Sequence, residues 1–114
     1  MQRESSSSVR VFFPPWSLDG LIERLKAYLP ALRDVIPVRR AVLFGSWADG
    51  KATAFSDVDV LITYGGPPRK DAYETVRGVL RLRGLEPHVY SQKEAEELKV
   101  TLDRMTRNGI VLFP

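Results

Sequence analysis

The sequence predicts an α/β (α+β) fold, a small mixed sheet with helices packed mostly on one face. The first observation is a set of short apolar runs of strand length at 38–44, 56–63, 85–91 and 110–113. The second is a helical spacing of apolar residues in the segments around these runs. The third is the length of 114 residues, which suffices for one compact domain but not for two.

The N-terminal segment is predicted to lie outside the domain. Residues 1–8 are rich in serine and poor in apolar side chains, so we expect them to be disordered. The domain then spans 9–114. Its first segment, 9–13, is expected to form a short extra strand, which the next two residues, both proline, bring to an end.

A first helix is predicted after this segment. Ser17 is a suitable N-cap, and leucine and isoleucine recur at helical spacing as far as Leu32. Pro30 has no backbone N–H, so we expect it to break or kink the helix. Pro37 follows the helix and marks its end, and the strand 38–44 comes next.

The rest of the chain alternates strands with helices. A Gly-Pro loop follows the second strand, a helix spans 72–83 and ends at Gly84, and a single helix spans 92–107. We expect three neighbouring strands in the central sheet, namely 38–44, 57–63 and 85–91. We also expect 18–29 and 92–107 to pack on a common face of that sheet.

Composition excludes several classes of protein. The chain has no cysteine, so it has neither disulfides nor thiolate zinc sites. No apolar run reaches the roughly 20 residues that cross a bilayer, and the start lacks the apolar core of a signal peptide. We therefore expect a cytoplasmic protein with no membrane partner. The formal charge of +3 is compatible with a nucleic acid partner but supports one only weakly.

The residues that carry chemistry lie around the first two strands. Gly45-Ser46 ends the first strand in a turn whose backbone N–H groups can face an anion. Asp57 and Asp59 are two residues apart in the second strand, so both carboxylates are expected on one side. Two carboxylates beside a phosphate-sized turn suit Mg²⁺ (or Mn²⁺) that is shared with a nucleoside triphosphate.

The third strand offers two further candidates. Glu86 and His88 are again two residues apart and therefore share a face. A two-metal phosphoryl-transfer site needs a third carboxylate that binds the second metal and deprotonates the attacking hydroxyl, a role open to Glu86. Pro87 adjoins this acid and could displace it. His88 is a base, a ligand or a structural residue on the sequence alone.

Two other groups have a plain structural interpretation beside a functional one. Arg69, Lys70, Arg77 and Arg81 form either a solvated basic face or a surface for phosphates, RNA or an acidic partner. Trp47, next to the Gly-Ser turn, is either a packing residue or a platform for a nucleobase.

Together, Gly45-Ser46-Trp47-Ala48-Asp49-Gly50 and Ser56-Asp57-Val58-Asp59-Val60-Leu61 resemble the GSxxxG…SDxDL signature of the DNA polymerase β-like nucleotidyltransferase superfamily, and in particular its minimal nucleotidyltransferases. The resemblance implies a polymerase β-like core and use of Mg²⁺ and an NTP, with ATP as the expected nucleotide. It also implies transfer of a nucleoside monophosphate to a hydroxyl, with Gly45, Ser46 and Ser56 binding the nucleotide.

The chain departs from the family at two positions. Minimal members commonly carry Arg where Asp49 stands, and a carboxylate there does not help to hold a triphosphate. The family's third carboxylate aligns with His88. Either Glu86 replaces that carboxylate, or the site binds one metal and turns over poorly.

The resemblance also implies a partner. Minimal nucleotidyltransferases are often paired with a HEPN-domain protein in toxin–antitoxin systems, so we expect a HEPN-type protein as acceptor. The alternative function is a catalytically weak antitoxin-like subunit that neutralises such a partner by contact. A second copy of the chain, as a homo-oligomer, is a further partner that the sequence leaves open.

Overall fold

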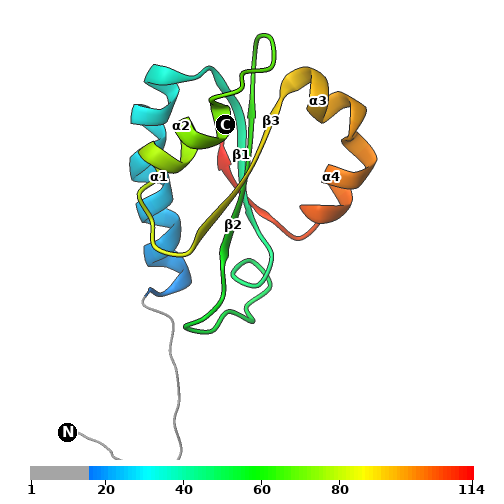
Figure 1. Cartoon of the computed structure of the whole chain (residues 1–114). Coiled ribbons are helices and arrows are strands. Elements are labelled where there is room, and N and C mark those ends of the chain that lie inside the picture. The colour runs from blue at the N-terminus through cyan, green and yellow to red at the C-terminus, as the bar shows by residue number, and fades with distance from the viewer. Residues whose placement is uncertain (1–15) are drawn as a thin grey trace, which may run out of the picture.

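The computed structural model describes residues 16–114. In this part of the chain the elements follow the predicted order of helices and strands (Figure 1). They are α1 (Leu18–Val35), β1 (Val38–Phe44), β2 (Val58–Tyr64), α2 (Ala72–Val79), β3 (Leu85–Ser91), α3 (Gln92–Glu97), α4 (Lys99–Met105) and β4 (Ile110–Phe113). The predictions for 1–8 and 9–13 fall outside the described residues.

The strands form one mixed four-stranded sheet in the order β3-β2-β1-β4. β1 is antiparallel to both of its neighbours, β2 and β4, whereas β2 and β3 are parallel. The end of β1 therefore lies beside the start of β2, where Phe44 pairs with Asp59. The parallel register places Glu86 opposite Asp59 and His88 opposite Leu61. This register assembles the predicted site residues at one end of the sheet.

The sheet carries helices on both faces (Figure 1). Buried leucines of α1 and the apolar side of α2 form the larger core with one face of the sheet. On the other face, Leu102 of α4 packs in a smaller cluster with Val42, Phe44 and Leu61. The mixed α/β fold is confirmed. The expectation that 18–29 and 92–107 share a face is wrong, because β1 and β2 present apolar side chains on both sides.

α1 begins as predicted, with the Ser17 hydroxyl accepting a hydrogen bond from the Gly20 N–H at 3.0 Å. It then continues through Pro30 to Val35. Pro30 is exposed, whereas Leu29 and Leu32 on either side of it are buried against the sheet. Burial of these leucines offsets the loss of the hydrogen bond that proline cannot make, so the predicted break does not occur.

The other helices are shorter than predicted. α2 ends at Val79, where buried Leu80 forms the C-cap, rather than continuing toward Gly84. The predicted single helix 92–107 is divided at Leu98 into α3 and α4. α3 starts directly from β3 through a capping box in which Ser91 and Glu94 exchange hydrogen bonds of 2.8 and 3.1 Å. No helix of residues 16–114 is long and apolar enough to cross a membrane.

Candidate active site

The Gly45 turn is the first component of the site. Gly45 has φ +77°, a conformation that glycine adopts without steric cost. A Cβ at this position would collide with Oδ2 of Asp59, so the glycine backbone lies directly against that carboxylate. The absence of a side chain at position 45 therefore allows the turn and Asp59 to approach each other.

The turn also leaves backbone donors free. The N–H groups of Asp49 and Lys51 donate to the carbonyls of Gly45 and Ser46 at 3.0 and 2.9 Å. Within the described chain, no backbone carbonyl accepts from the first three N–H groups after Gly45, those of residues 46–48. Successive free N–H groups of this kind form a favourable environment for an anion.

Asp59 and His88 are in direct contact. Nε2 of His88 lies 3.2 Å from Oδ1 of Asp59, and because an ionised carboxylate only accepts, the imidazole N–H is the donor. Both side chains are partly buried, with 25% of Asp59 and 28% of His88 exposed. The ring of Phe44 packs on the imidazole, with centroids 4.9 Å apart, and so fixes its position.

The other two acids flank this pair without joining it. Asp57 is exposed and lies one residue before β2, and Glu86 is exposed beside Asp59 in the register. Pro87 leaves the strand register intact, with Glu86 opposite Asp59, because β3 is an edge strand and tolerates a residue without an N–H. Residues 16–114 contain no group of three histidine or carboxylate side chains arranged to hold a metal ion.

The two serines of the motif differ in their engagement. Ser56 accepts a hydrogen bond from the Thr53 N–H at 2.8 Å, and its own N–H donates to the Thr53 carbonyl at 3.1 Å. Ser56 thus shapes the loop that leads into the aspartates. Ser46 is half-buried in the Gly45 turn. Its hydroxyl is carried by the first of the three residues, 46–48, whose N–H groups have no backbone acceptor in the described chain.

A polar cavity of about 220 Å³ adjoins the turn, and sequence reasoning missed it. Its lining brings Gly45 and Asp49 together with Arg104 and Arg107, which lie at and just after the end of α4. These arginines are 59 or more positions from Gly45, so the motif gives no sign of them. The sequence shows only that both residues are cationic and lie near the end of the predicted helix 92–107.

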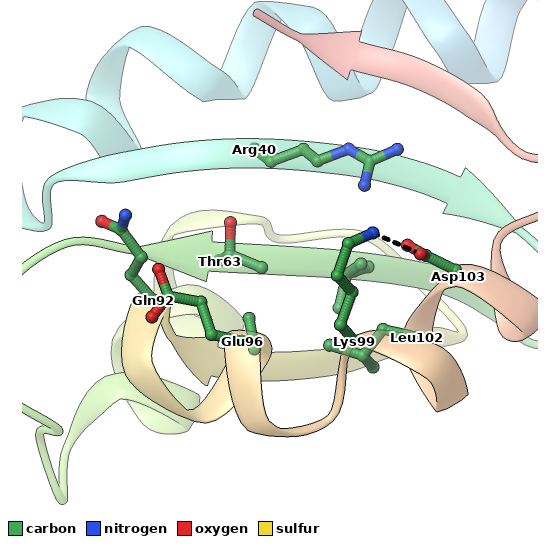
Figure 2. A pocket seen from close by; sticks show the side chains of 9 residues that line it. Arg40, Thr63, Gln92, Glu96, Lys99, Leu102 and Asp103 are labelled. Carbon is green, nitrogen blue, oxygen red and sulfur yellow. Dashed lines mark hydrogen bonds and ion pairs between the residues drawn. The ribbon is translucent and has the colours of Figure 1, made fainter.

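A second cavity, of about 250 Å³, lies between the same sheet face and the α3–α4 pair (Figure 2). It is lined by Arg40 and Thr63 from the strands and by Glu96, Lys99 and Asp103 from the helices. Thr63 is four residues along β2 from Asp59, a separation of about 13 Å. This cavity is therefore distinct from the Asp59 site.

The predicted basic face has a structural part. Arg69 binds both carboxylate oxygens of Asp71, at 3.0 and 2.9 Å, and donates to the Val35 carbonyl at 3.1 Å. The hydrogen bonds with Arg69 lower the pKa of the Asp71 carboxyl. Trp47 is likewise structural, since it is 4% exposed and packs in the larger core.

The sequence profile of the Nucleotidyltransferase domain family matches residues 20–111, which is most of the chain. The chain belongs to the nucleotidyltransferase domain family. Among curated proteins, "Putative protein adenylyltransferase MJ0126" of Methanocaldococcus jannaschii is 29% identical over 94 residues, covering 82% of each chain. The predicted relationship to the polymerase β-like nucleotidyltransferases is thereby confirmed.

Two solved structures share the fold of this chain. A toxin–antitoxin structure with AMP-PNP aligns with a TM-score of 0.58 at 20% identity, covering 77% of this chain and 72% of the other. A complex of a tri-AMPylated Shewanella oneidensis HEPN toxin with an MNT antitoxin aligns with a TM-score of 0.54 at 17% identity, covering 81% and 71%. At these identities the likeness establishes the fold of this nucleotidyltransferase domain.

Proposed function

We propose that this chain is a Mg²⁺-dependent nucleotidyltransferase that transfers AMP from ATP to a hydroxyl of a protein partner. The observation that carries the proposal is the placement of the Asp59 carboxylate between the Gly45 turn and His88. A turn with free N–H groups suits the phosphates of a nucleotide, and a partly buried carboxylate beside it suits a cation that accompanies them.

In the proposed reaction the acceptor oxygen forms a bond to the α-phosphorus of ATP. The bond between that phosphorus and the oxygen bridging to the β-phosphate breaks, and pyrophosphate leaves with the electron pair. The hydroxyl proton passes to a base or to water. Positioning and charge neutralisation supply most of the rate in such a transfer, so the fixed groups around Asp59 matter more than a covalent participant.

Asp57 and Asp59 are the residues that would hold the metal. Mg²⁺ is commonly bound through one or two carboxylates together with substrate phosphates, so the donor set fits without a third protein ligand. When bound, the ion would neutralise charge on the phosphate oxygens. Gly45 and Ser46 would hold the triphosphate through the turn, and Ser56 would act by fixing the loop before Asp57.

His88 and Glu86 are the candidates for handling the acceptor proton. In the free protein the Nε2–H of His88 is directed at Asp59, so this nitrogen orients the carboxylate and is not available as a base. Glu86 is exposed beside Asp59 in the register and has the required open carboxylate. We therefore assign His88 to positioning and leave proton acceptance to Glu86 or water.

The partner we propose is a HEPN-type protein. The support comes from the relatives: one curated relative carries the name of a protein adenylyltransferase, and one structural neighbour is an antitoxin bound to an AMPylated HEPN toxin. A partner hydroxyl would enter beside Asp59, where the sheet end is open enough to leave a quarter of this side chain exposed.

The test is transfer of labelled AMP from ATP to a co-expressed HEPN-type partner by the parent chain, Asp59→Asn and Asp34→Asn. Asparagine can still accept the His88 hydrogen bond, so the first variant removes charge with little change of shape. We expect its transfer to fall by about 10²–10³-fold. Asp34, exposed on α1 across the sheet, is the matched control and should stay at the parent rate. Equal transfer by all three proteins would contradict the proposal.

One observation favours a second function, that of a subunit which neutralises a HEPN-type partner by contact. The position expected to hold a third carboxylate is His88, and its nitrogen is already bonded to Asp59. A site of this kind can bind a nucleotide yet turn over poorly. For a subunit that acts by contact, Asp57→Ala should leave both the complex and the neutralisation of the partner intact. If neutralisation depends on AMP transfer, the same substitution should abolish it.

A further inference from the structure

We infer that the cavity beside the Gly45 turn is a polyphosphate subsite, in which Arg104 and Arg107 bind the β- and γ-phosphates of the nucleotide. The inference rests on the proposed function for its substrate, and it assigns a role to two residues outside the sequence motif. Gly45 is the connection, because it lies against the Asp59 carboxylate on one side and lines the arginine cavity on the other.

The charges in this cavity favour an anion. Two guanidinium groups and one carboxylate, that of Asp49, contribute to its lining, which leaves a net charge of +1. Among residues 16–114, neither Arg104 nor Arg107 forms an ion pair with a carboxylate. Both are exposed and free to reorient. Guanidinium binds phosphate oxygens in a bidentate manner, which makes arginine well suited to such a site.

The cavity in Figure 2 is an internal comparison. It also contains two cations, Arg40 and Lys99, but Glu96 and Asp103 balance them and the net charge is zero. Lys99 is already engaged, with Nζ 2.5 Å from a carboxylate oxygen of Asp103. The net charge of the lining therefore distinguishes the two cavities, and of the two only the one at Gly45 has an excess of cations over carboxylates.

The position of the arginines also has a simpler explanation. Arg104 lies in the last turn of α4, where a cation stabilises the negative end of the helix dipole. That explanation predicts a loss of thermal stability without any change in anion affinity. A phosphate site predicts the reverse, so the two are separable in one set of variants.

We would measure binding of MgATP, and separately of tripolyphosphate, by isothermal titration to the full chain at fixed ionic strength. The variants are Arg104→Ala, Arg107→Ala and Asp49→Asn, with Arg77→Ala as the matched control on α2, across the sheet. Each arginine loss should weaken both ligands about tenfold, the effect of one charge-assisted hydrogen bond. Asp49→Asn should strengthen both by about threefold, since an exposed repulsive charge is removed. Arg77→Ala should equal the parent.

The outcomes separate the subsite from the reaction. Parent-like affinity for both ligands in Arg104→Ala and Arg107→Ala would overturn the subsite while leaving the proposed transferase intact. If the parent transfers no AMP, but the two variants bind tripolyphosphate more weakly than the parent does, the subsite is upheld and the proposed function is overturned. A lowered melting temperature with unchanged affinity would show that Arg104 serves only α4. A parent that binds neither ligand would overturn both proposals.

Discussion

At the scale of single residues, Gly45 joins the two halves of the proposed site. Its positive φ makes the turn in which the next three backbone N–H groups have no backbone acceptor among residues 16–114, and its missing side chain makes room for the Asp59 carboxylate. Both requirements fall on one position, whereas most turn glycines satisfy only the first. Gly66, for example, has φ +85° but nothing within 4 Å of a Cβ built on it.

This contrast gives a matched pair of substitutions. Gly45→Ala and Gly66→Ala should each lose about 1–2 kcal/mol of unfolding free energy from the left-handed backbone. Only Gly45→Ala should also weaken MgATP binding, because its Cβ displaces Asp59. Denaturant melts and titration of both variants measure the two effects. Equal nucleotide affinity in the two would show that the contact with Asp59 has no part in binding.

His88→Asp tests the position that the resemblance assigns to a carboxylate. The substitution removes the hydrogen bond to Asp59 and adds a like charge, so we expect the nucleotide-free protein to lose stability. With Mg²⁺ and ATP present, the added charge should raise AMP transfer by at least about tenfold, by analogy with other charge-stabilising groups. The measurements are thermal melts with and without Mg²⁺ and transfer of labelled AMP.

His88→Asn is the control for that experiment, since it keeps a side-chain donor at similar size without adding a charge. It should transfer AMP at or below the parent rate. An inactive His88→Asp protein beside a fast parent would mean that His88 itself takes part in the chemistry, and that no carboxylate is missing.

At the scale of elements, the loop between β2 and α2 is held by Arg69. Its guanidinium binds Asp71 through two hydrogen bonds and reaches the end of α1 at the Val35 carbonyl, while its backbone N–H donates to the Tyr64 hydroxyl at 2.8 Å. Asp71 is the N-cap of α2, yet its side chain makes no cap hydrogen bond. The carboxylate is occupied by Arg69 instead.

The Arg69–Asp71 pair predicts a dependence of stability on acid pH. Arg69 lowers the pKa of the Asp71 carboxyl in the folded state, so the pair stabilises the fold above the unfolded value of about 3.9. That stabilisation is lost as pH falls from there through the lower folded pKa. Asp71→Asn should melt slightly below the parent at pH 7, and the two should converge once the pH lies below the lowered pKa of Asp71. The pair is exposed, so the difference should be small and should shrink in high salt.

Melting curves of both proteins at several pH values test this. Asp103→Asn is a suitable control, because Asp103 is also paired with a neighbouring cation, Lys99, but on α4. A constant difference between the parent and Asp71→Asn across this pH range would show that the effect comes from a contact that does not titrate.

At the scale of the whole molecule, the two faces of the sheet are unequal. The larger core lies under α1 and α2. Among residues 16–114, the smaller cluster under α3 and α4 has four buried side chains, Val42, Phe44, Leu61 and Leu102. Asp59 shares a face with Leu61 by strand alternation, so the site lies on the side of the smaller cluster. The larger core under α1 and α2 holds the strands in place, and the smaller cluster under α3 and α4 leaves one end of the sheet accessible.

The sequence by itself was sufficient for the fold class, for the strands β1, β3 and β4, and for the membership of the nucleotidyltransferase family. These depend on local properties: β-branched runs bounded by glycine and proline, and a turn motif whose residues are close along the chain. It failed where a local rule competed with packing. Pro30 stays in a helix because its neighbours are buried, and the segment 92–107 crosses to the second face because β1 and β2 are apolar on both sides.

Only the tertiary structure decided how the site residues meet. Alternation along a strand placed Glu86 and His88 on one face, but the parallel register of β2 and β3 determined that His88 contacts Asp59. The arginines at the end of α4 come to Gly45 through the pairing of β4 with β1, which no motif contains. Local patterns fix which residues form a strand or a turn, whereas contacts between residues far apart in the chain depend on packing of the whole sheet.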